Sequence, residues 1–196
     1  MIIEYSVIFH SNWHCGSGLA AGADVDALVI KDKNGLPYIP GKTIKGLIRE
    51  AVEDYLQFTG DDEETRNAFI GAFGIPVSDN CLDKTNGDAF FTNVELEDSL
   101  RTNIIKAELQ KYLYTNVAST AIDDDGIAKK NSLRRIEVTV PCELTGKIFN
   151  VNDKIFDIII KSFGFIKHIG VNRNRGLGRC TVSLKGKEGK NDNSTI

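Results

Sequence analysis

The sequence predicts a single α+β domain, and three observations lead to that prediction. The chain has 196 residues, a length typical of one domain with room for an insertion. Its hydrophobic fraction of 41% and charged fraction of 26% are those of a protein with an ordinary apolar core. Segments with a two-residue apolar period and segments with a helical period follow one another along the chain.

The chain opens with a predicted strand over residues 2–10. Its apolar residues alternate with polar ones, so one face of the strand carries Ile3, Tyr5, Val7 and Phe9. A glycine-rich segment without a periodic pattern comes next. Extended structure, interrupted by one turn, is expected before the first helix, with the stretches at 27–31 and 36–41 and the turn at 33–35.

The first helix is expected to begin near Thr43, a residue type that caps helices. Apolar residues recur at three- and four-residue steps up to Tyr55, which gives this helix a core-facing stripe. The same two periodicities predict the later elements: a helix at 63–73, strands at 88–95, 133–140 and 143–149, a helix at 153–163 and a strand at 179–184. The order strand, helix, strand, strand, helix, strand is that of the ferredoxin-like, or RNA-recognition-motif, fold.

Two regions lie outside that order. Residues 97–132 are polar and irregular, with a helical pattern near Ile104 to Leu113, and form the candidate insertion in a domain that spans 1–184. Residues 185–196 have no apolar pattern, so we expect a mobile tail there.

Composition argues against several classes of protein. No apolar run is long enough to cross a membrane, and no secretory signal is recognisable, so we expect a cytoplasmic protein without a membrane partner. The four cysteines include no close pair, which favours free thiols over a zinc site. A net charge of −3, from 24 basic and 27 acidic residues, argues against a nonspecific nucleic-acid binder. Bases nevertheless gather locally, at 129–130, 134–135 and 167–179.

The start of the first helix has the residues of a phosphate-binding surface. Lys42, Lys45 and Arg49 project to one side of a helix with 3.6 residues per turn. A helix N-terminus adds free N–H groups and the positive end of a dipole, which suits a polyanion. An ordinary amphipathic helix with a basic flank has the same pattern. A nucleotide-hydrolysing P-loop is excluded because residue 36, where its first glycine belongs, is leucine.

Two glycine-rich loops carry the remaining candidates. The closing loop, 170–178, holds Arg173 and Arg175 between glycines, which let a ligand approach the backbone while arginine forks match phosphate oxygens. Asp24 and Asp26 follow the first loop, and two residues apart on an extended chain they point to one side, where they are able to share a metal ion. Solvated turns and caps use the same residue types, and both interpretations stay open.

These segments occur in an order that resembles a known family. The runs GADVDALVIKD at 22–32 and NGLPYIPGKTIKGLIR at 34–49 resemble the signature of the repeat-associated mysterious protein (RAMP) superfamily. The loop GVNRNRGLG at 170–178 resembles that superfamily's C-terminal glycine-rich loop. Within the superfamily, the chain is most similar to the repeated backbone subunit of type III CRISPR effector complexes.

The resemblance implies a ferredoxin-like palm with glycine-rich loops and an inserted hairpin, the thumb, that kinks the guide–target duplex; here the thumb would lie within 97–132. The family's catalytic acid corresponds to Asp26, which would hold Mg²⁺ or another divalent cation for cleavage of target RNA, whereas Asp24 has no counterpart. Positions that face guide RNA in the family correspond to His14, Lys42, Thr43, Lys45, Arg49, Arg173 and Arg175. The implied partners are guide RNA, target RNA, further copies of the chain and other effector subunits.

The resemblance leaves two alternatives open. Some members of the superfamily hold guide RNA without cutting it, which would make the chain a scaffold. Others process the guide with a histidine in the active site, and this chain has three histidines.

Overall fold

The computed structural model describes residues 1–21, 24–75 and 86–185. Gly22 and Ala23 of the first glycine-rich segment, and all of the expected tail except Lys185, lie outside the described residues. Within the described ranges, no helix combines the length and the apolar character that crossing a membrane requires.

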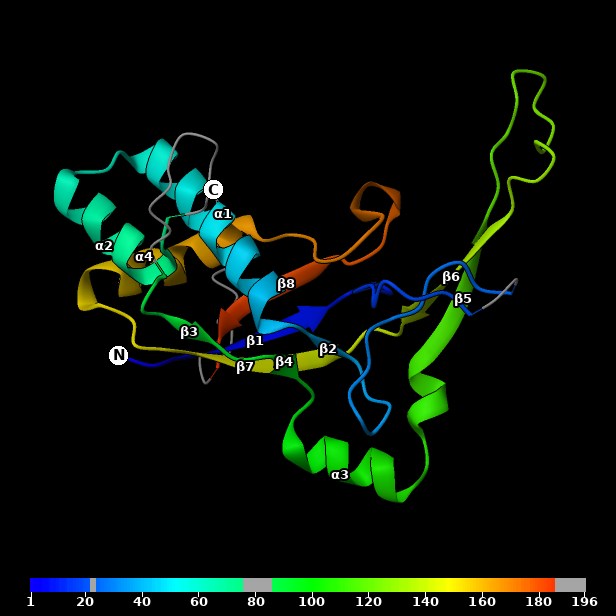
Figure 1. Ribbon diagram of the computed structural model, residues 1–196, viewed down its shortest axis with the longest axis horizontal. Coiled ribbons are helices and arrows are strands. Elements are labelled where there is room, and N and C mark those ends of the chain that lie inside the picture. Colours follow the sequence, from blue (N-terminus) through cyan, green and yellow to red (C-terminus); the bar gives the residue numbers. More distant parts are fainter. Residues whose placement is uncertain (22–23, 76–85, 186–196) are drawn as a thin grey trace, which may run out of the picture.

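An antiparallel sheet forms the centre of the molecule (Figure 1). Its strands are β1 (Ile3–Phe9), β2 (Tyr38–Ile39), β3 (Phe90–Phe91), β4 (Val94–Glu95), β7 (Glu143–Phe149) and β8 (Cys180–Leu184). The order across the sheet is β2-β4-β7-β1-β8, and β3 also pairs with β7. β1 therefore lies between β7 and β8, as the strand 2–10 must if its apolar face is central to the core. This arrangement is compatible with the expected ferredoxin-like order.

Three helices cover one side of the sheet: α1 (Gly41–Thr59), α2 (Glu63–Phe73) and α4 (Asp153–Ser162) (Figure 1). The apolar stripe predicted for the first helix faces the sheet, because Ile44, Ile48 and Val52 have no exposed surface. Ile155 and Ile159 of α4 are equally buried. The alternating face of β1, which includes fully buried Tyr5 and Val7, completes the same core.

The prediction that Thr43 caps the first helix was wrong. The helix begins two residues earlier, at Gly41, and its N-cap is Pro40, which provides no side-chain hydrogen bond. Thr43 instead lies in the first turn, where its N–H donates to the carbonyl of Pro40 at 2.9 Å. The early start brings the helix against β3: a Cβ on Gly41 would lie 2.3 Å from the carbonyl oxygen of Phe91, so only glycine fits.

The single strand expected at 88–95 is divided into β3 and β4. The break at Thr92 and Asn93 has polar partners of its own. The amide oxygen of Asn93 accepts the N–H of Gly41 at 3.0 Å, and the Thr92 hydroxyl accepts the N–H of Lys147 at 2.9 Å. The interruption therefore anchors the start of α1 to the sheet.

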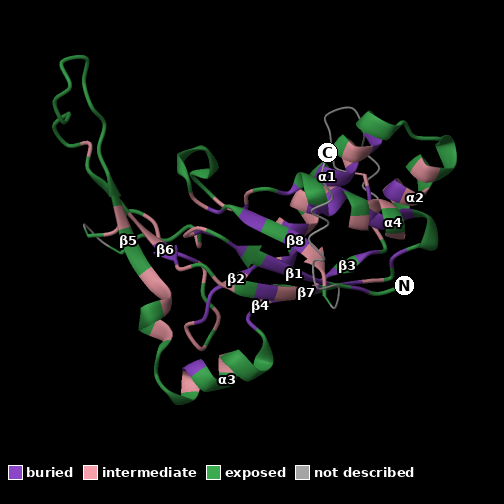
Figure 2. Ribbon diagram, turned by 180° about the vertical axis from the view of Figure 1, so that it is seen from behind, coloured by how far each residue is buried: buried purple, intermediate pink, exposed green. Residues whose placement is uncertain are grey.

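The candidate insertion begins with α3 (Asp98–Lys106) and a 3₁₀ turn, η1 (Gln110–Leu113), before β5 (Tyr114–Ser119). β5 pairs with β6 (Arg134–Thr139) from Tyr114–Thr139 to Ser119–Arg134, and this ribbon projects away from the body (Figure 1). The strand expected at 133–140 is therefore present, but it belongs to the ribbon and not to the central sheet. The tip between the strands is exposed along its length (Figure 2).

The cysteines are free where the structure describes them. Cys15 and Cys180 are buried and Cys142 is half-buried, whereas Cys81 lies outside the described residues. Burial raises the pKa of Cys15 and of Cys142 to about 11, and that of Cys180 to about 12. These three thiols are therefore protonated and unreactive near neutral pH.

Candidate nucleic-acid interface

Asp26 lies exposed beside β6, near the outer end of the paired ribbon, where Arg135 is one residue from the last pair. Its backbone N–H donates to the carbonyl of Arg135 at 2.8 Å, and its Oδ2 accepts the N–H of Arg135 at 2.7 Å. The carboxylate is therefore held in place through one oxygen by the backbone of β6. The side chain that the resemblance implies as catalytic is therefore positioned where the paired strands pass into the ribbon tip.

The segment that follows Asp26 is fastened along β6 by Glu137, a residue that sequence reasoning did not single out. The Glu137 carboxylate accepts the N–H of Val29 at 3.0 Å and pairs with Lys31 Nζ at 2.8 Å. Its own N–H donates to the carbonyl of Ala27 at 3.0 Å. Because these contacts join residues more than a hundred positions apart, no local pattern in the sequence reveals them.

His14 is buried, with 2% of its surface exposed, and so does not face a ligand directly in this conformation. Its Nδ1 lies 2.6 Å from the carbonyl oxygen of Glu137. Its own carbonyl accepts the N–H of Val171 at 3.1 Å, and a Cβ on Gly170 would lie 2.2 Å from the same oxygen. His14 thus joins β6 to the closing glycine-rich loop, and Gly170 is required for that approach.

The three bases of α1 share one hollow on the side of the helix that faces β3. Lys42 is exposed, whereas Lys45 and Arg49 are half-buried. Burial, and to a smaller extent the charge of Arg49, lower the pKa of Lys45 below its usual value. The shared side predicted for these bases is therefore present, although Thr43 is not among the described residues that line the hollow.

Arg49 is already engaged with the protein. Its Nε pairs with Glu53 at 3.0 Å, its guanidinium donates to the carbonyl of Gly74 at 3.3 Å, and it lies over the ring of Phe69. Lys42 has no ion pair within the described part of the chain. Of the bases in the hollow, Lys42 is consequently the most available to a phosphate group.

The closing loop presents its arginines on a short 3₁₀ turn, η3 (Arg173–Arg175). Both side chains are exposed, and the N–H of Arg175 donates to the carbonyl of Asn172 at 2.8 Å. Arg173 and Arg175 line a second hollow, which includes Leu47 and Glu50 of α1. On a helix these positions lie away from Lys42 and Lys45. The structure therefore divides the predicted RNA-binding bases between two sides of α1.

The acidic residues suit a cation site in which the substrate and water provide some of the ligands, rather than one in which the protein provides all of them. In residues 1–21, 24–75 and 86–185, no group of three or more His, Cys, Asp or Glu side chains is arranged to hold a metal ion. Mg²⁺ is commonly held by one or two carboxylates together with substrate phosphates and water. The exposed carboxylate of Asp26 suits that form of binding.

A family comparison matches residues 7–181 to the RAMP superfamily. The chain belongs to the RAMP superfamily. No curated protein matches its sequence. Two solved structures of type III-B Cmr-beta have similar chains. One, bound to cognate target RNA, gives a TM-score of 0.68 at 10% identity over 94% of this chain and 97% of that one. The other, in the apo state, gives 0.69 at 11% identity over 95% and 98%. At such identities the likeness shows a shared fold.

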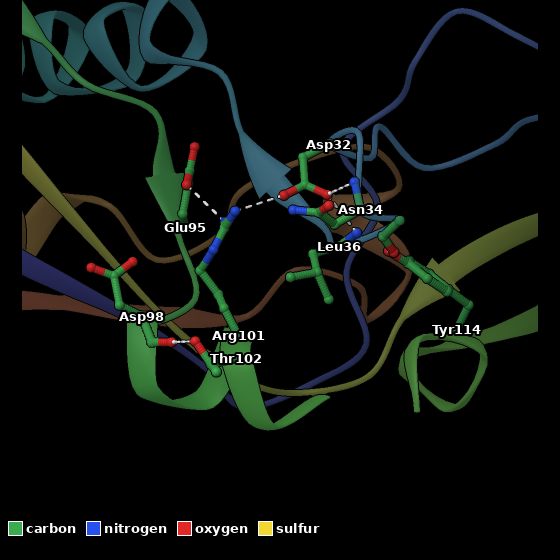
Figure 3. Close-up of polar contacts among 9 residues, drawn as sticks. Asp32, Asn34, Leu36, Glu95, Asp98, Arg101, Thr102 and Tyr114 are labelled. Atoms are coloured by element: carbon green, nitrogen blue, oxygen red, sulfur yellow. Dashed lines mark hydrogen bonds and ion pairs between the residues drawn. The ribbon is translucent and has the colours of Figure 1, made fainter. Parts of the chain in front are cut away.

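In this RAMP domain, Arg101 of α3 ties the insertion to the first signature segment and to β4 (Figure 3). Its guanidinium pairs with Asp32 at 2.8 Å and with Glu95 at 2.8 Å. The other oxygen of Asp32 accepts two backbone N–H groups of the turn 32–36. The hydroxyl of Tyr114 donates to a carbonyl of the same turn at 2.7 Å. The turn between the signature segments is thus fixed by two residues from the first half of the insertion, Arg101 and Tyr114.

Proposed function

We propose that this protein binds guide RNA as a repeated backbone subunit of a type III CRISPR effector complex. We further propose that it cleaves complementary target RNA and that Asp26 is the catalytic residue. The observation that carries the proposal is the position of Asp26, exposed and oriented by Arg135 near the outer end of the paired strands of a projecting ribbon. Family membership and the fold shared with Cmr-beta chains, one of them in a complex bound to cognate target RNA, support the assignment.

Guide RNA is proposed to follow the basic side chains on either side of α1. Lys42 and Lys45 offer cations to backbone phosphates, and Arg173 and Arg175 offer forks that bind two phosphate oxygens at once. His14 acts behind this surface, because it is buried and supports the closing loop through its carbonyl. Contacts to phosphates by themselves do not depend on the base sequence of the guide.

Cleavage is proposed to use the target RNA's own ribose. When the ribbon displaces the base of one target nucleotide, the 2′-hydroxyl of that nucleotide's ribose is free to align with the adjacent phosphate. Alignment is itself a large part of catalysis. The 2′-oxygen then bonds to phosphorus and the 5′-oxygen departs with a proton, leaving a cyclic phosphate and a 5′-hydroxyl. A divalent cation bound at Asp26 would stabilise the charge that develops on the phosphate.

Replacement of Asp26 tests the proposal. Asp26→Asn keeps the size of the side chain and an oxygen that accepts the Arg135 N–H, but removes the charge. Cleavage of complementary RNA by the assembled complex should fall by about 100-fold or more, while target binding persists, and EDTA should have the same effect on the unsubstituted protein. Asp24→Asn is the matched control and should cleave normally.

The alternatives predict different outcomes in that assay. A non-cleaving scaffold shows no activity even before substitution. A guide-processing enzyme cuts precursor guide RNA without Asp26 and depends on a histidine. His14 is buried and His10 Nε2 is hydrogen bonded to Thr181 at 2.8 Å, so the second alternative would depend on His168, which is half-buried and lines the hollow beside the closing loop.

A further inference from the structure

The hollow beside the closing loop is lined by opposite charges that do not meet. The cations that line it are Arg134 of β6, Lys167, which precedes the closing loop, and Arg173 and Arg175 of the loop. Glu50 and Asp54 line it from α1. None of these six side chains makes an ion pair with any residue in the described part of the chain. A ligand that fits here must offer acceptors to the cations and donors to the carboxylates.

An exposed aromatic ring belongs to the same hollow. Phe165 lines it and has 41% of its surface exposed. Two rings of α1 contact Phe165: Tyr55 edge-on at 6.1 Å and 88°, and Phe58 at 6.3 Å and 55°. Aromatic rings beside arginines are the surface on which proteins stack the bases of single-stranded nucleic acid.

We propose that this hollow binds one unpaired nucleotide of RNA. The base stacks on Phe165, the flanking phosphates lie on Arg173 and Arg175, and Glu50 or Asp54 accepts a hydrogen bond from the base. The inference rests on the proposed RNA-binding function and adds to it the kind of nucleotide bound. A carboxylate accepts from the amino group of cytosine but repels the carbonyl oxygen that uracil has at the same position. The site therefore favours cytosine over uracil.

Three single-stranded RNAs of equal length test the inference with the full chain: oligocytidine, oligouridine and an abasic ribose-phosphate chain. Phe165→Ala should weaken the binding of oligocytidine about tenfold, the usual effect of losing one stacked base. It should leave the abasic chain unaffected, and Phe165→Tyr should restore binding. Tyr112→Ala is the control, because Tyr112 is an exposed aromatic residue that lines neither this hollow nor the basic hollow of α1.

Two further variants separate the contributions of charge. Arg173→Gln with Arg175→Gln should weaken all three RNAs, since phosphates are common to them. Glu50→Ala with Asp54→Ala should reduce the ratio of cytidine to uridine affinity toward one. The inference is overturned if Phe165→Ala weakens the binding of the abasic chain as much as that of oligocytidine. It is also overturned if Phe165→Ala weakens the binding of neither RNA while the arginine variant still loses binding. Failure of the unsubstituted protein to bind any RNA would overturn the proposed function as well.

Discussion

Lys45, one of the bases in the hollow of α1, has a pKa that is shifted by its surroundings. Its pKa lies below the ordinary 10.5, first because burial disfavours the cation and second because Arg49 is near. An RNA phosphate favours the cation, so binding should raise this pKa and take up a proton at alkaline pH. RNA affinity should consequently fall as the pH rises through the pKa that Lys45 has in the free protein. The fall should be at most about tenfold for each unit by which RNA raises that pKa.

RNA affinity measured across the alkaline range checks this expectation. Lys45→Arg should abolish the fall that Lys45 causes, because guanidinium stays charged throughout that range. Lys42→Arg, a change of the same kind at an exposed position of the same hollow, should keep the fall. An unchanged pH profile for Lys45→Arg would show that phosphate does not reach Lys45.

Single residues were predictable from the sequence when their environment is local. The exposure of Asp26 follows from its place between a glycine-rich loop and an extended stretch. The burial of His14 was not predictable, because it depends on Glu137 and on the closing loop, both more than a hundred residues away. Glu137 itself has no sequence signal, since an acidic residue in a strand normally indicates a solvated face.

At the scale of elements, α1 offers a salt-dependence test. Replacing Lys42, Lys45 and Arg49 together by glutamine should weaken RNA binding whatever the sequence. For single strands, each phosphate contact contributes a slope of about −0.7 to log K against log salt, so losing the contacts of Lys42 and Lys45 should make the slope shallower by about 1.4. Arg49, which is engaged with Glu53 and Gly74, should add less. Replacing the exposed lysines Lys106, Lys111 and Lys161 by glutamine removes the same charge elsewhere and should leave the slope almost unchanged. Equal slopes for both triple variants would place RNA elsewhere.

The insertion gives a second test, of stability. Arg101→Ala removes two ion pairs and leaves Asp32, whose side chain is only 15% exposed, without its cation. The free energy of unfolding should fall by about 1–3 kcal/mol, as expected for hydrogen-bonded charges that are partly buried. Lys147→Ala breaks an ion pair with Glu4 in which both side chains are about half exposed, and should lower the free energy of unfolding much less than Arg101→Ala does. Denaturant unfolding of both variants decides whether α3 is held as strongly as its contacts indicate.

Elements were predictable wherever local periodicity decides them. The helix expected at 63–73 is α2 over the same residues, and the apolar stripe of α1 is buried as expected. Periodicity does not say which strand pairs with which, so the partner of β6 was not evident. Nor does it show that Asn93 must turn to the start of α1, which is why one expected strand became β3 and β4.

At the scale of the molecule, the body and the ribbon separate two tasks. The body follows the order predicted from the sequence, because alternating apolar patterns specify a layered core. The ribbon tip between Ser119 and Arg134 has polar contacts largely of its own, such as Thr120 with Ser132 at 2.6 Å and the N–H of Ile127 with Asp123 at 2.8 Å. Since the tip contributes little to the core, its role is expected to lie in contacts with other molecules.

Removal of the tip tests that role and the expected assembly of copies along one guide. Residues 120–133 lie between Ser119 and Arg134, the last pair of the β5–β6 ladder. A two-residue Asn-Gly turn is therefore able to replace them and close the hairpin. The shortened chain should keep its thermal unfolding temperature within a few degrees, and it should bind an RNA long enough for one copy as before. On a long RNA it should no longer form particles with many copies, because head-to-tail assembly needs two different surfaces on each copy. Sedimentation or mass photometry with both RNAs measures this directly.

A control that changes Asp123, Asp124 and Asp125 to asparagine keeps the length of the tip and shows whether its charge or its length is required. If the shortened chain forms particles of unchanged copy number, the ribbon does not mediate assembly, and contacts between the bodies must align the copies.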